Sequence, residues 1–155
     1  MNDEDKIAFS VNLTALCPLA DDPLLVELLV NGTVVDSCKA TNKHVLKTVF
    51  NDEVEATHKV TIRISGKTNK HTEMDNTFIN VIKSAEIDLN EFTFNDYDIN
   101  EILKNNAKIT HDGNGYDEMK EYNYNKCVGF NSDTTFTFTT PLYKWLIENI
   151  AEWEQ

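Results

Sequence analysis

The sequence predicts an all-β fold, an antiparallel β-sandwich of jelly-roll-like arrangement with a short internal helix and a C-terminal α-helix. Three observations carry this prediction. Apolar and polar residues alternate with a period of two in several short segments, turn residues separate those segments, and no long helical segments alternate with them as in βαβ units. The 155 residues suit a single domain, residues 1–155, with the C-terminal helix at 141–154.

The first half of the chain predicts five strands, two of them joined by a tight hairpin. Residues 7–13 alternate apolar and polar side chains, as expected for a strand with one buried face. In VELLVNGTVVDS, Asn31 and Gly32 lie between two apolar runs, and Asn-Gly favours the two positive φ angles of a type I′ turn. Residues 44–50 predict a further strand. Residues 58–66 predict another, which ends at a glycine that permits a turn.

The second half predicts two strands and two helices. Residues 78–89 alternate with a break, bulge or edge near Lys83, and residues 133–140 place two phenylalanines on one face and threonines on the other. In DINEILKNN, Asp98 and Glu101 have the spacing of a capping box. The C-terminal helix is predicted to start with Thr140 as its N-cap and Pro141 in its first position.

The C-terminal helix carries more apolar residues than one buried stripe requires. Two roles are open for them: large aromatics can plug the open end of a sandwich, or they can anchor a partner. The candidate partner-binding residues are Leu142, Tyr143, Trp145, Leu146 and Trp153.

Composition excludes several classes of protein. The net charge is −12 with a pI near 4.6, and the 14 basic residues are scattered, so no patch suits nucleic acid. The longest apolar run, LLVELLV, contains a glutamate and is too short to span a membrane. An acidic N-terminus is unlike a secretory signal. Three cysteines without a CxxC pair fit synthesis in a reducing cytoplasm better than a disulfide framework.

Two polar segments contain candidate metal ligands. KITHDGNGYDEMK fails the spacing of a calcium EF-loop, and its Gly-Asn-Gly favours a turn between strands, although Asp112 and Asn114 could serve a looser oxygen-ligand calcium site. KTNKHTEMDNT brings His71 near Asp75, which suits a divalent ion, acid–base chemistry or a solvated loop. We expect no obligatory cofactor, with Ca²⁺ as the candidate ion.

No sequence motif indicates a particular enzymatic reaction. The serines lie in no GxSxG elbow, and the chain has no GxGxxG or GxxxxGK[ST] phosphate loop. We therefore expect a protein that is not an enzyme, and a metal-dependent enzyme is only a third hypothesis.

Taken in order, VELLVNGTVV, HKVTIRISGKTNKHTEMD, ITHDGNG and VGFNSDTTFTFTTPLYKWLIENI resemble small β-sandwich proteins of tailed bacteriophages, over residues 24–150. The resemblance implies a non-enzymatic structural or binding protein of the virion, such as a capsid decoration or tail-associated protein, made in the host cytoplasm. Its implied partners are other virion proteins or further copies of the chain.

The N-terminal half also resembles the jelly-roll domains of calcium-dependent carbohydrate-binding modules, in which an ELxVNG-type hairpin precedes a polar loop that meets the ligand. That resemblance implies surface glycans as partners and places His71, Thr72, Glu73 and Asp75 near the ligand. Sugar platforms normally use paired aromatics presented by strands, and the sequence does not show such a pair. Calcium-assisted carbohydrate binding is therefore the alternative function.

Overall fold

The computed structural model describes residues 6–74, 81–112 and 118–153, with the backbone alone for residues 82 and 150–153. Its strands are β1 (Lys6–Leu16), β2 (Leu24–Val30), β3 (Thr33–Ala40), β4 (Lys43–Asn51), β5 (Ala56–Ser65), β6 (Thr72–Met74), β7 (Val81–Ser84), β8 (Glu86–Phe94), β9 (Tyr97–Asp98), β10 (Lys108–His111), β11 (Lys120–Asn123), β12 (Cys127–Val128) and β13 (Ser132–Thr140). The α-helices are α1 (Asn100–Asn106) and α2 (Leu142–Trp153), and a short 3-10 helix, η2 (Asn69–His71), lies between β5 and β6.

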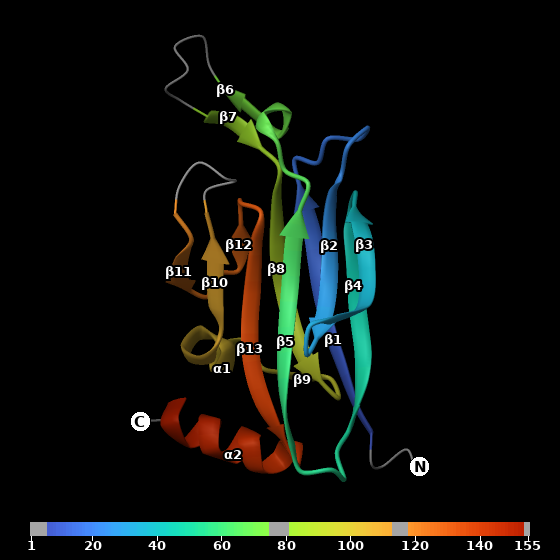
Figure 1. The fold of residues 1–155 in the computed structure, drawn as a ribbon, viewed down its shortest axis with the longest axis vertical. Helices are drawn as coiled ribbons and strands as arrows, with labels where there is room; N and C mark the ends of the chain where they lie inside the picture. Colours follow the sequence, from blue (N-terminus) through green and yellow to red (C-terminus); the bar gives the residue numbers. More distant parts are fainter. Residues whose placement is uncertain (1–5, 75–80, 113–117, 154–155) are drawn as a thin grey trace.

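Two antiparallel sheets form the sandwich, which confirms the predicted fold class (Figure 1). Sheet A has the order β12-β8-β1-β4, with β9 paired to β8, and sheet B has the order β11-β10-β13-β5-β2-β3. The chain passes repeatedly from one sheet to the other, so most neighbouring strands are distant in sequence. A separate hairpin of β6 and β7 projects from one end, and α2 crosses the opposite end.

The inward faces of the two sheets meet in one apolar core. Phe9 on β1 lies 5.3 to 6.4 Å, between ring centroids, from Phe50, Phe92, Phe94 and Phe136. These rings come from both sheets, and their tilted or edge-on arrangements are those that aromatic pairs prefer. The predicted alternation of residues 7–13 is confirmed, because every second residue of this strand is fully buried.

The predicted turn at Asn31-Gly32 and the predicted break near Lys83 both have counterparts in the structure. Asn31 and Gly32 have φ angles of 50° and 85°, which confirms the positive-φ hairpin between β2 and β3. The break expected near Lys83 lies at Ala85, where the chain leaves β6 and joins β1 in sheet A as β8. The pairing of β6 with β7 also has a register shift between Lys83 and Val81, so both an irregularity and a change of pairing partner lie near the predicted position. Residues 75–80 lie outside the described part.

The internal helix is confirmed, and its predicted capping box is wrong. The Asp98 carboxylate accepts a hydrogen bond from the backbone N–H of Asn100 (2.8 Å), so it does serve the helix start. Glu101 does not reach back to complete the box. Its carboxylate instead accepts from Lys104 Nζ at 2.8 Å, one turn further along the helix.

The C-terminal helix is also confirmed, but its start was predicted wrongly. Thr140 is the last residue of β13, and its hydroxyl donates to the carbonyl of Val54. The helix begins at Leu142, whose N–H donates to the side chain of Asp52 at 2.7 Å. A carboxylate 90 positions earlier therefore satisfies the first turn. Among the described residues, no helix is long and apolar enough to cross a membrane.

Candidate functional site

Three stacked rings form an exposed feature at one edge of sheet B. His111 on β10 lies between Tyr122 on β11 and Phe130, which follows β12. The centroid of the imidazole is 4.9 Å from that of Tyr122 and 4.3 Å from that of Phe130, with interplanar angles of 13° and 7°. Tyr122 and Phe130 are 44% and 43% exposed. A near-parallel stack so open to solvent is unusual for core packing, since large aromatics are mostly buried.

Strand pairing explains two of the three positions. In the antiparallel register, His111 faces Lys120 and Ile109 faces Tyr122. Side chains two residues apart on a strand share a face, so His111 and Tyr122 are diagonal neighbours on the same side of the hairpin. The prediction that KITHDGNGYDEMK joins two strands agrees with this register, while residues 113–117 themselves lie outside the described part.

The stack forms a wall of a cleft of about 500 Å³ between β10 and β11 on one side and the β12 segment on the other. In Figure 1, β12 lies behind β10 and β13. The lining residues are Ile109, His111, Tyr122, Asn123, Asn125, Cys127, Val128, Gly129 and Phe130. This size and this mixture of apolar, aromatic and a few polar groups are typical of small-ligand sites.

The cleft has no formal charge of its own. None of its described lining residues is Asp, Glu, Lys or Arg, although the chain as a whole has a net charge of −12. Cys127 Sγ donates to Glu86 Oε2 at 3.0 Å. Partial desolvation is the larger cause, and this hydrogen bond the smaller one, that together raise the pKa of Cys127 to about 11. The thiol is therefore protonated at neutral pH and is a weak nucleophile.

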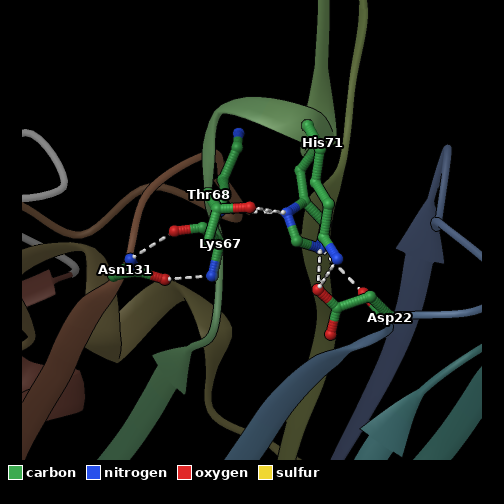
Figure 2. A network of polar contacts seen from close by, with 6 residues as sticks. Asp22, Lys67, Thr68, His71 and Asn131 are labelled. Carbon is green, nitrogen blue, oxygen red and sulfur yellow. Dashed lines mark hydrogen bonds and ion pairs between the residues drawn. The ribbon is translucent and has the colours of Figure 1, made fainter.

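A network of polar contacts includes Asn131, the residue after Phe130 (Figure 2). Lys67 is only 7% exposed. Its Nζ donates to Ser84 Oγ and to the carbonyl of Gly129, each at 2.6 Å. Its backbone N–H donates to Asn131 Oδ1 at 2.8 Å, and Asn131 Nδ2 donates to the Lys67 carbonyl at 3.0 Å. Burial lowers the pKa of Lys67.

The same network contains His71, one of the predicted metal ligands. The imidazole is buried, and its Nδ1 accepts from the backbone N–H of Thr68 at 2.9 Å. With that nitrogen as acceptor, the Nε2–H of the neutral ring donates to the carbonyl of Asp22 at 2.7 Å (Figure 2). Both ring nitrogens are thus engaged within the protein. In this arrangement His71 ties two loops together and offers no lone pair to a metal.

The other metal candidates do not form a site with it in the described residues. Asp112 follows β10 and is half-buried, while Asp75 and Asn114 lie outside the described part of the chain. Within residues 6–74, 81–112 and 118–153, no three His, Cys, Asp or Glu side chains gather as a metal site would require.

The candidate partner-binding residues of α2 divide between the core and the surface. Leu142 and Trp145 are buried, and the Trp145 ring lies edge-on to Phe94 and Phe138 at 6.1 and 6.0 Å. Leu146 is partly buried against the same core, and Tyr143 is 65% exposed. The side chain of Trp153 is outside the described part. Two of the five candidates therefore plug the end of the sandwich and present no free surface.

Nothing in the sequence pattern predicts Tyr122 or Phe130 as site residues. Tyr122 lies in the segment KEYN, which forms β11. Four residues are too few for alternation of apolar and polar side chains to predict a strand. Phe130 lies in no regular element, so no periodicity marks it.

Comparison with protein-family models, with curated proteins and with solved structures yielded no match. The resemblances to phage sandwich proteins and to carbohydrate-binding modules therefore stay predictions from the sequence.

Proposed function

We propose that this protein is a non-enzymatic binding protein and that its cleft takes a neutral saccharide. The observation that carries the proposal is the exposed stack of Tyr122, His111 and Phe130 along a cleft that lacks charged side chains. A sugar ring has an apolar C–H face and a polar rim of hydroxyls. Aromatic faces suit the first, and amide side chains suit the second.

The chemistry of the cleft favours this ligand over others. An anionic ligand would gain no cationic partner from the lining, and it would meet the field of a strongly acidic protein. Asn123 and Asn125 contribute amide N–H groups that can donate to hydroxyl groups, while their oxygens accept from Lys108 Nζ at 2.6 Å and from the Cys127 N–H at 3.4 Å. Sugar platforms use aromatic side chains presented by strands, and the sequence pattern did not show such residues. In the structure, Tyr122 on β11 is an aromatic residue presented by a strand.

Catalysis has less support from Cys127 in the cleft and from His71, which does not line the cleft. The thiol of Cys127 is protonated at neutral pH, and the imidazole of His71 is engaged at both nitrogens. Neither group is placed as an activated nucleophile or a general base with a free lone pair.

A glycan array, read with and without a chelator, tests the proposal. We expect retention of one class of neutral glycan. Tyr122→Ala and Phe130→Ala should each weaken binding about two- to tenfold, because each removes an aromatic face worth roughly 0.5–1.5 kcal/mol. The chelator arm reports whether a divalent cation takes part in the binding.

Tyr97→Ala is the matched control, since Tyr97 is 48% exposed on β9 and does not line the cleft. It should bind as the unmodified protein does. An array on which no glycan is retained, or equal retention by all three variants, would show that the cleft is not a saccharide site.

A further inference from the structure

Phe130 is the only ring of the stack that does not lie on a paired strand. His111 and Tyr122 are held by the β10–β11 ladder. Phe130 lies between β12 and β13, in a stretch without regular backbone pairing. A loop residue needs other contacts to hold its ring within a fraction of an ångström of one position.

Both neighbours of Phe130 are bound by the same residue, Lys67. The Gly129 carbonyl accepts from Lys67 Nζ at 2.6 Å. On the other side, Asn131 exchanges two hydrogen bonds with the Lys67 backbone, at 2.8 and 3.0 Å. Lys67 is itself next to Thr68, whose N–H is bound by the buried His71. The loop is therefore attached to the turn that His71 ties to the Asp22 loop (Figure 2).

The charge of Lys67 is not explained by packing alone. A buried ammonium is costly, and an apolar side chain of similar volume is often equally or more stabilising at such a place. The two hydrogen-bond acceptors of the ammonium, the Ser84 hydroxyl and the Gly129 carbonyl, are neutral, and the negative charge of the Glu86 carboxylate favours the charged form. What the ammonium supplies, and a methylene chain cannot, is a directed hydrogen bond to the residue before Phe130.

We propose that Lys67 is a positioning residue of the cleft, whose ammonium group holds the Gly129 carbonyl and thereby keeps the Phe130 ring stacked on His111. The effect on ring geometry is independent of any ligand. Only the effect on saccharide affinity rests on the proposed function.

The ring protons of His111 supply a direct readout. A proton above or below an aromatic face is shifted upfield in an NMR spectrum, and His111 has such a face on each side. Phe130→Leu and Tyr122→Leu calibrate the two contributions separately. Lys67→Met should move the His111 ring signals at least half of the way to their positions in Phe130→Leu, while the contribution of Tyr122 persists.

Lys83→Met is the matched control, because Lys83 is an exposed lysine on β7 that pairs with Glu73. It should leave the His111 signals unchanged. If Lys67→Met fails to fold, Lys67→Gln replaces it, since an amide is tolerated in a polar site but is too short to reach Gly129 as the ammonium does. Either variant with His111 signals at their original positions would overturn the proposal.

An affinity measurement separates this inference from the proposed function. For a glycan retained on the array, Lys67→Met should weaken binding by about the same factor as Phe130→Leu, and the double variant should be no weaker than Phe130→Leu alone. If the cleft binds no glycan, the NMR result still decides whether Lys67 positions Phe130. An unaltered affinity with altered ring signals would contradict a role for Lys67 in binding.

Discussion

At the scale of single residues, the structural role of His71 differs from the role that its sequence surroundings indicate. Its sequence surroundings, with Glu73 and Asp75 nearby, are typical of a metal ligand or a solvated loop. In the fold it is a buried tie between the Thr68 turn and the Asp22 loop. The Asp22 carbonyl is 49 positions away in the sequence, so no local pattern could have predicted this contact.

His71→Ala should lower the free energy of unfolding by about 1–3 kcal/mol, because it removes two hydrogen bonds made by the ring and opens a cavity where the buried imidazole was. Urea denaturation measures the change. Lys70→Ala is the control: its ammonium pairs with the Asp22 carboxylate at 2.7 Å on the surface, where solvent screens the pair, so its loss should change stability little. Equal effects of the two variants would contradict the buried role of His71.

The partly buried phenol of Tyr124 should make the stability of the protein fall at high pH. Burial, aided by the carboxylates of Asp88 and Asp98, raises the pKa of the phenol well above 10, whereas the unfolded chain ionises it near pH 10. The folded state thus holds the proton more tightly. Its stabilising contribution is complete below about pH 10 and is lost as the pH rises further.

The unmodified protein should therefore lose stability more steeply between about pH 10 and pH 12 than Tyr124→Phe, which has no phenol to ionise. Urea titrations at a series of pH values compare the two slopes. Cys127, whose pKa is also raised, is present in both proteins and cancels in the comparison. Parallel slopes would mean that the phenol is not protected in the fold.

At the scale of elements, the segments with the strongest local signals are those that the sequence predicted well. The Asn31-Gly32 hairpin was predictable because two adjacent residues determine its backbone angles. Strand β12 was not predictable, because it is two residues long and exists only through its pairing with β8. The start of α2 was misassigned because its capping carboxylate, Asp52, comes from a distant loop.

The division of α2 between core and surface predicts a contrast between two aromatic residues. Trp145→Ala should cost about 3–5 kcal/mol, since the buried ring packs on Phe94 and Phe138 at the end of the sandwich. Tyr143→Ala should change stability by less than about 0.5 kcal/mol, because its side chain is 65% exposed. Thermal or urea unfolding measures both. Similar losses in the two variants would contradict this packing.

At the scale of the whole molecule, the cleft depends on how the two sheets end. Sheet B extends past β13 to β10 and β11, and sheet A closes at the same edge with the two-residue β12. Inward-facing side chains of the hairpin, Ile109 and His111, therefore meet a short strand and a loop instead of a full sheet. The polar network that includes Asn131 links this edge to the loop before β2.

The sequence by itself determined the fold class, the buried parity of the long strands, the Asn31-Gly32 turn and the existence of both helices. These follow from periodicity and from backbone preferences of adjacent residues, which act locally. The tertiary structure decided which residues cap α2, why His71 is buried, and that His111, Tyr122 and Phe130 stack. Each of these contacts joins residues that are distant in the sequence. Strand register and sheet packing bring the partners together, and the residues next to each partner in the sequence do not determine register or packing.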